Sequence, residues 1–436
     1  MNKRFFVMSF CLCLSLAAAA VAGDPARNGP DFDRWADIPD LLAAAPPAVP
    51  AAPAPADITV MVYLNAKNDL ERFGLADVNE MERVGSTLGM NIVAELGRSA
   101  DYDQSEGDWK GSRRYLVQVD ADTAAITSPV LQSLPSADLG DWRHLAEFGK
   151  WAKANFPAKR YMLIVWNHGS GWEKGLPAAG RDRGISYDMD TGNHISPAEL
   201  ALALEEMGGV DVYASDACRM QMAEVAYELR RHASVIVGSE EDEYSSGYYY
   251  PWFLEKLSAK TSASPEEAAA FAVEAFRDYY AYFDRGATHS AVRATALDGL
   301  AARLKAWSAA FMASGERDLA RAAKKKAQTF RVRDNKDLYD LVRVVTEGTR
   351  DAALVGMGRD LLGFMENSLF VANGTVTAEY DNAMGLAVYA PVSAYNPAYS
   401  GGAWADAAGW SEFAQWYAGI RPEEDSWFPE VKEAKR

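Results

Sequence analysis

Short apolar runs alternate with stretches of helical character along the first half of the chain. Continuous runs of apolar and β-branched residues, typical of strands buried on both faces, lie at 58–64, 90–96, 161–166, 210–214 and 235–237. A further strand is predicted at 115–119. Predicted helices between the strands cover 70–88, 142–155 and 220–231. Strands that alternate with helices indicate an α/β fold with a mostly parallel sheet covered on both faces.

The second half of the chain has a different pattern. Its predicted helices cover 265–283, 297–313, 317–330 and 336–345, and two later β signals lie at 368–371 and 385–389. We therefore expect a core of the fold at 57–260. Residues 261–436 form a mainly helical region, with some β structure, that completes this fold.

The N-terminus has the order of a secretory signal peptide. Lys3 and Arg4 precede an apolar run at 5–21, and small residues at 20–22 predict cleavage after Ala22. An uncleaved membrane anchor is the alternative, but the run is at the lower limit for a bilayer span. Residues 23–56 predict a tether, since Ala or Pro occupies 13 of the 14 positions at 43–56. We expect export to the periplasm, the cell envelope or the medium, with no membrane span after cleavage.

Charge and cysteine content narrow the function. The chain has 44 basic and 61 acidic side chains and a net charge of −17, which argues against a nucleic-acid-binding surface. Its cysteines are Cys11, Cys13 and Cys218, and this spacing excludes a disulfide framework or a Cys-cluster zinc site. Signal cleavage leaves Cys218 as the one cysteine of the mature chain.

Two predicted strand ends carry residues with chemical potential. His168 lies in Asn-His-Gly-Ser-Gly-Trp directly after the strand at 161–166, and Cys218 lies in Asp-Ala-Cys-Arg after the strand at 210–214. Ligands of open parallel sheets bind at the carboxyl ends of the strands. A thiolate can attack a carbonyl while an imidazole transfers protons, and the glycines leave backbone amides free to stabilise an oxyanion.

Each residue also has a structural interpretation, because buried cysteines and single histidines are common in cores. The joint placement of Cys218 and His168 favours catalysis. Serine hydrolase chemistry is disfavoured because the chain lacks Gly-x-Ser-x-Gly. The other histidines are predicted to lie on the surface or on helices without a catalytic setting; they are His144, His194, His232 and His289.

Several sequence blocks together resemble the clostripain family of cysteine peptidases. The matching blocks are Asn-Asp-Leu-Glu at 68–71, Asn-His-Gly-Ser-Gly-Trp at 167–172, Asp-Ala-Cys-Arg-Met at 216–220, Val-Gly-Ser-Glu-Glu at 237–241, Asp-Leu-Tyr-Asp-Leu at 337–341 and Gly-Leu-Ala-Val-Tyr-Ala-Pro at 385–391. The resemblance extends from about residue 58 to about residue 420. It implies a caspase-like α/β/α sandwich and endopeptidase activity on peptide or protein substrates.

The resemblance also implies roles for individual residues. His168 would be the general acid and base, Cys218 the nucleophile, and the amides of Gly169 and Cys218 the oxyanion hole. Family members commonly cleave after Arg or Lys, and Asp216 matches one acid of their P1 pocket. The second acid usually lies in a turn after the Ser-Glu-Glu block. Here that stretch is Ser-Ser-Gly-Tyr at 245–248, which leaves Glu241, Asp242 and Glu243 as candidates.

Relatives of this type often mature by a cut between the His and Cys blocks. Arg181 and Arg183 lie in a glycine-rich segment there and are the candidate processing sites, with an ordinary basic surface loop as the alternative. No cofactor is expected to be required, although the resemblance leaves calcium open. Asp188 to Gly192 fits a calcium loop poorly, and Ser196 to Glu199 fits a helix capping box better.

The predicted function is that of an exported, monomeric cysteine endopeptidase. One alternative is a catalytically silent protein of the same fold that binds peptides. Another is an amidase or transpeptidase that forms the same acyl-thioenzyme.

Overall fold

The computed structural model describes residues 55–100, 102–172 and 184–420. The predicted signal peptide, nearly all of the predicted tether and both candidate processing residues, Arg181 and Arg183, lie outside the described residues. The described residues belong to a single compact unit.

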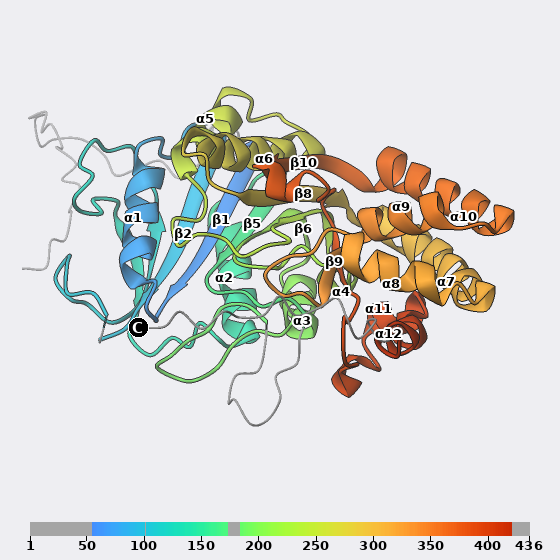
Figure 1. The fold of residues 1–436 in the computed structure, drawn as a ribbon. Coiled ribbons are helices and arrows are strands. Elements are labelled where there is room, and N and C mark those ends of the chain that lie inside the picture. Colours follow the sequence, from blue (N-terminus) through green and yellow to red (C-terminus); the bar gives the residue numbers. More distant parts are fainter. Residues whose placement is uncertain (1–54, 101, 173–183, 421–436) are drawn as a thin grey trace, which may run out of the picture. The chain divides into compact units, whose positions relative to one another are not determined.

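A nine-stranded sheet, in the order β10-β8-β7-β6-β5-β1-β2-β3-β4, forms the centre of the described structure (Figure 1). Its strands are β1 (Ile58–Ala66), β2 (Met90–Arg98), β3 (Gly111–Leu116), β4 (Val130–Leu134), β5 (Tyr161–Trp166), β6 (Val210–Asp216), β7 (Ala233–Gly238), β8 (Ala287–Arg293) and β10 (Phe370–Val376). The central strands β2, β1, β5, β6 and β7 are parallel. Antiparallel strands complete both edges.

Helices cover both faces of this sheet. One face packs against α1 (Glu71–Glu82), α5 (Tyr250–Ala259) and α6 (Pro265–Tyr282), and the other against α2 (Trp142–Asn155), α3 (Pro197–Glu206) and α4 (Ala223–Leu229). Alternate β1 side chains enter opposite cores, because successive residues of a strand point to opposite faces. The predicted α/β/α sandwich with a central parallel sheet is confirmed.

The C-terminal region extends the hydrophobic core on the sheet face that α2, α3 and α4 cover. It contains α7 (Leu297–Ser314), α8 (Arg317–Lys326), α9 (Leu338–Gly348), α10 (Ala352–Phe364), α11 (Ala403–Ala407) and α12 (Trp410–Ala418). A small antiparallel sheet pairs β9 (Asn335–Asp337) with β11 (Ala387–Tyr389). The same region supplies β8 and β10 to the main sheet, so the C-terminal half of the chain is part of the sandwich.

Some predicted boundaries were wrong. The helix predicted to end at residue 88 stops at Glu82, because Gly85 adopts a φ of +65° and its backbone packs against Val119. Strand β3 ends at Leu116, so the strand predicted at 115–119 lies too far along the chain. The helix predicted over 317–330 ends at Lys326.

Strand β8 was not predicted, because its sequence Ala-Thr-His-Ser-Ala-Val-Arg is largely polar. Thr288, His289 and Ser290 are nevertheless buried. Ser290 donates a hydrogen bond to the carbonyl of Gly385 at 2.6 Å, and the Thr288 hydroxyl accepts from the amide of Glu240 at 3.2 Å. These partners offset the desolvation of the buried polar groups.

The predicted capping box at the start of α3 is confirmed, with Ser196 and Glu199 each bonding the other's backbone amide. Asp188 in the preceding loop accepts from the amide of Leu139 at 3.0 Å and forms a salt bridge with Lys67 at 3.2 Å. This carboxylate therefore serves to hold the loop. None of the described helices is both long enough and apolar enough to cross a membrane.

Candidate active site

The His and Cys segments leave neighbouring parallel strands. Trp166 at the end of β5 pairs in register with Asp216 at the end of β6, so the two segments emerge side by side. His168 and Cys218 line the same pocket, whose volume is about 110 Å³. Gly169 permits this close approach, because a Cβ there would lie 2.4 Å from the carbonyl oxygen of Cys218.

The backbone of the His segment is held by its neighbour Asn167. The Asn167 side chain is buried, donates to the carbonyl of Asn65 at the end of β1 and accepts from the amide of Tyr187 at 2.8 Å. Within the described part of the chain, no hydrogen bond is donated by the amides of Gly169 or Cys218. These amides are the donors that the sequence analysis assigned to an oxyanion hole.

His168 has a carboxylate partner that the sequence analysis did not assign. Nε2 of His168 lies 2.8 Å from Oδ1 of Asp69, which follows β1 and is 99 residues away in sequence. Asp69 belongs to one of the blocks of the family resemblance, but sequence alone gave no reason to pair it with His168. A carboxylate so placed orients the ring by a hydrogen bond.

The surroundings of Cys218 favour the neutral thiol. Burial, together with the nearby charges of Glu243 and Asp242, raises its pKa to about 12. Its sulfur accepts from the backbone amide of Glu243 at 3.2 Å and lies 3.7 Å from the carbonyl oxygen of the same residue. No hydrogen bond joins the thiol to His168 within the described residues. Cys218 and His168 thus line one pocket without a direct hydrogen bond between them.

Asp216 forms an acidic wall of the pocket. Its buried carboxylate accepts from the amide of Tyr248 at 3.2 Å and from the hydroxyl of Tyr250 at 2.9 Å. Gly247 lies directly against it, since a Cβ on Gly247 would be 2.3 Å from Oδ1 of Asp216. Burial raises the pKa of Asp216 to about 6 despite these hydrogen bonds.

The three candidates for the second acid have distinct environments. Glu243 lines the pocket beside Asp216. Asp242 is neutralised by salt bridges to Arg219 at 2.7 Å and Arg331 at 3.1 Å. Glu241 accepts from the amide of Arg331 at 2.8 Å and from other groups away from the pocket. Of the three candidates, Glu243 is therefore the one that lines the pocket.

Further carboxyls lie behind Asp216. Asp77 and Glu80 come from α1; burial, with Asp216 nearby, raises the pKa of Asp77 well above its usual value and that of Glu80 to about 7. Burial and the charge of Asp216 also raise the pKa of Glu243 strongly. In the described structure none of Asp77, Asp216 and Glu243 forms a salt bridge with Lys or Arg. A cation in the pocket would supply the missing charge.

His289 was predicted to lie on the surface or a helix, and this is wrong. Its ring is fully buried in β8, where Nε2 lies 2.5 Å from the hydroxyl of Tyr248. Burial lowers its pKa to about 3, so the ring is neutral. Nδ1 of His289 lies 3.7 Å from Oε1 of Glu243. A neutral imidazole does not cancel the negative charge of the pocket.

Comparison with known proteins agrees with this geometry. The profile of the clostripain family matches residues 62–359, which is more than half of the chain. The chain therefore belongs to the clostripain family, a family of cysteine peptidases and thus of hydrolases. Clostripain from Hathewaya histolytica is 28% identical over 232 residues. That match spans 48% of this chain and 44% of the relative, so the chain covers less than half of the relative's length.

Solved structures share the fold. A secreted C11 cysteine protease from Bacteroides thetaiotaomicron, in complex with an irreversible peptide inhibitor, superimposes with a TM-score of 0.62 at 20% identity, over 81% of this chain and 99% of that chain. An inactive zymogen C11 protease from Parabacteroides distasonis gives a TM-score of 0.58 at 20% identity, over 85% of this chain and 100% of that chain. The resemblance and the fold class predicted from the sequence are both confirmed.

Proposed function

We propose that this chain is an exported cysteine endopeptidase that cleaves peptide bonds after Arg or Lys. The observation that carries the proposal is the pocket beside Cys218, in which Asp216 and Glu243 line the wall without a Lys or Arg partner among the described residues. A guanidinium or ammonium side chain held there would place its own carbonyl next to the thiol. Family membership supplies the reaction class.

The proposed reaction has two stages. His168 takes the proton of the Cys218 thiol, and the thiolate attacks the substrate carbonyl to form a tetrahedral intermediate stabilised by the amides of Gly169 and Cys218. The carbon–nitrogen bond then breaks and His168 protonates the leaving amine. In the second stage His168 activates water, which releases the acyl group from sulfur. Asp69 stabilises the imidazolium formed in both stages.

Binding of a cationic substrate would also make the Cys218 thiol easier to ionise. Negative charge at Glu243 is one cause of the raised pKa of Cys218. A cationic P1 side chain beside Glu243 would compensate that charge and lower the cost of ionising the thiol. Basic substrates would in this way gain both binding and a more easily formed nucleophile.

A P1-scanning peptide library with the purified mature chain tests the proposal. We expect hydrolysis of Arg and Lys peptides, loss of all hydrolysis in Cys218→Ala and a reduction by orders of magnitude in His168→Ala. Iodoacetamide should label Cys218 as the one thiol of the mature chain. Hydrolysis by Cys218→Ala at the parent rate would exclude the proposed nucleophile. Peptide binding without turnover by the intact chain would favour the catalytically silent alternative.

We also propose processing at Arg181 or Arg183, which have the residue type expected at P1. One protein of similar fold is described as an inactive zymogen, and another as secreted, which accords with maturation of an exported chain. Mass spectrometry of fragment termini should show a cut in the parent chain and none in Cys218→Ala. A fully active parent that stays one chain would contradict processing, and equal cutting of Cys218→Ala would assign the cut to another protease.

A further inference from the structure

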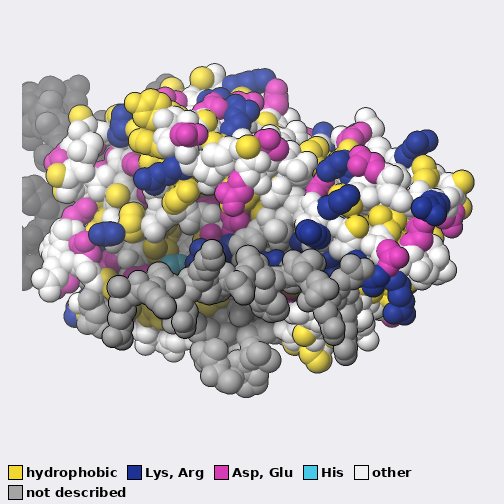
Figure 2. Space-filling view, in the orientation of Figure 1, with side chains coloured by type: hydrophobic (Ala, Val, Ile, Leu, Met, Phe, Trp, Pro, Cys, Tyr) yellow, Lys and Arg dark blue, Asp and Glu magenta, His cyan; other side chains and the backbone are white. Residues whose placement is uncertain are grey.

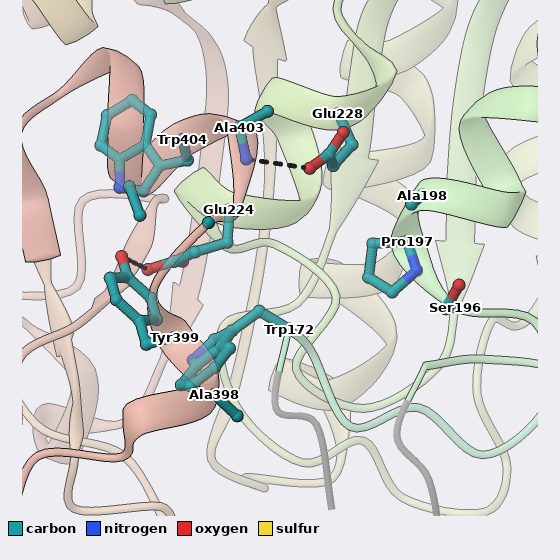
Figure 3. A pocket seen from close by; sticks show the side chains of 13 residues that line it. Trp172, Ser196, Pro197, Ala198, Glu224, Glu228, Ala398, Tyr399, Ala403 and Trp404 are labelled. Carbon is teal, nitrogen blue, oxygen red and sulfur yellow. Dashed lines mark hydrogen bonds between the residues drawn. The ribbon is translucent and has the colours of Figure 1, made fainter.

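A second acidic pocket lies between α3, α4 and the segment that leads into α11 (Figure 3). Its volume is about 170 Å³. Glu224 and Glu228 of α4 line it together with the aromatic rings of Trp172, Tyr399 and Trp404. None of these residues takes part in the proposed peptidase reaction.

Glu224 has one satisfied and one unsatisfied oxygen. Its Oε1 accepts from the backbone amide of Tyr389 at 2.9 Å and from the hydroxyl of Tyr399 at 2.7 Å. Its Oε2 is buried and has no hydrogen-bond partner, and only 7% of the residue is exposed. A buried carboxylate oxygen without a partner is costly, so the pocket favours a ligand that donates a hydrogen bond there.

The charge of the pocket is uncompensated. In the described part of the chain, neither Glu224 nor Glu228 forms a salt bridge with Lys or Arg. Glu228 accepts one hydrogen bond, from the amide of Ala403 at 3.4 Å. Burial raises the pKa of Glu224 to about 7, and a nearby cation would favour its ionised form. The ligand that this site fits is therefore positively charged.

The aromatic walls distinguish an organic cation from a metal ion. Trp172 and Tyr399 pack edge to face with their ring centroids 4.6 Å apart. Organic ammonium groups are attracted to such ring faces. Calcium takes six to eight oxygen ligands, and the described residues contain no cluster of three or more metal-ligating side chains. The two carboxylates with aromatic neighbours match an ammonium head and an apolar stem.

We propose that this pocket binds an organic ammonium group with a short alkyl stem, as carried by a lysine side chain or a small alkylamine. The ammonium donates to Oε2 of Glu224, with Glu228 nearby, and the stem lies against Trp172 and Tyr399. The inference is independent of the peptidase mechanism, because the residues involved are not those of the Cys218 pocket.

Calorimetric titration with n-butylammonium chloride tests the proposal on the full mature chain carrying Cys218→Ala, which prevents self-digestion. We expect binding events at two sites, of which Asp216→Asn weakens one and Glu224→Gln the other by at least about tenfold. 1-Butanol, which has the same stem without the charge, should bind the Glu224 site at least about tenfold more weakly. Unchanged two-site binding in Glu224→Gln would overturn the proposal, as would equal binding of butanol.

Two controls separate binding from folding. Gln at position 224 retains an oxygen for the amide of Tyr389 and the hydroxyl of Tyr399, so its melting temperature should stay near that of the parent. Ala198 lines the pocket from the exposed start of α3, so Ala198→Leu adds bulk to the pocket and leaves both carboxylates in place. It should also abolish the Glu224-dependent event. Retained binding in Ala198→Leu would place the ammonium elsewhere and contradict the proposal.

Discussion

Glu240 and Glu243 lie on one short segment after β7, but their side chains have different surroundings. Glu243 points with Asp216 into the pocket beside Cys218. Glu240 is buried against Asp337, whose carboxylate accepts from the amides of Asp340 at 2.6 Å and Met384 at 2.7 Å. Burial is the first cause of a raised pKa in all four carboxyls.

The Glu240–Asp337 and Asp216–Glu243 pairs differ in whether a pocket opens onto them. The Glu240–Asp337 pair joins the segment after β7 to β9; both residues are buried, and Asp337 accepts hydrogen bonds from backbone amides. The Asp216–Glu243 pair lines a pocket, where the proposed function places the substrate cation. A perturbed carboxyl pair therefore indicates substrate binding only where a pocket opens onto it. On the face seen in Figure 2, acidic and basic side chains are interspersed, so surface charge gives no comparable signal.

The largest expected effect concerns the Asp216–Glu243 pair, which lines the pocket beside Cys218. Asp216→Asn should lower kcat/KM for an Arg substrate by about 10²-fold or more, because it removes one member of a desolvated charge pair. Glu243→Gln should act in the same direction. The matched control is a norleucine substrate, which lacks the cation. Equal losses on both substrates would show that Asp216 serves to shape the Cys segment.

In the Glu240–Asp337 pair, substitution of Asp337 should lower the free energy of unfolding. Asp337→Ala removes the N-cap of α9 and the acceptor of the Met384 amide, so we expect unfolding free energy to fall by about 2–3 kcal/mol. Denaturant titration measures this loss. The Arg-to-norleucine ratio of kcat/KM should stay unchanged. A large change in that ratio would break the distinction between the two pairs.

Selectivity should depend on pH through Asp216. Its pKa of about 6 means that the cation-binding carboxylate is mostly protonated at pH 5 and mostly ionised at pH 7. The Arg-to-norleucine ratio of kcat/KM should therefore rise about tenfold over this range. The norleucine substrate is the reference for every ionisation that does not depend on the P1 charge. A flat ratio would contradict ionisation of Asp216 as the source of selectivity.

The smallest effect is expected from Glu240→Gln. The folded-state pKa of Glu240 is raised by burial, so between the unfolded pKa of about 4.3 and the folded value the native state binds more protons. Unfolding free energy then falls as pH rises. Gln cannot ionise, and the variant should be more stable than the parent at pH 8 by about 1 kcal/mol. Melting curves at pH 4 should coincide, and equal curves at pH 8 would contradict this account.

Local patterns in the sequence determined much of this protein. The continuous apolar runs gave the central parallel strands, since a strand buried on both faces carries apolar residues at every position. Together with the two chemical segments at strand ends, they placed His168 and Cys218 at one edge of the sheet. Ser196 and Glu199 gave the start of α3, because a capping box is a local interaction.

Tertiary structure decided everything that depends on contacts between distant segments. The sequence of strand β8 is largely polar, so only its contacts with buried partners in the folded chain identify it as a strand. Asp69 meets His168 across 99 residues. The choice of Glu243 over its neighbours as the second acid depends on which way each side chain turns. Periodicity records whether a position is buried, but the partners that satisfy a buried polar group are set by packing of the whole chain.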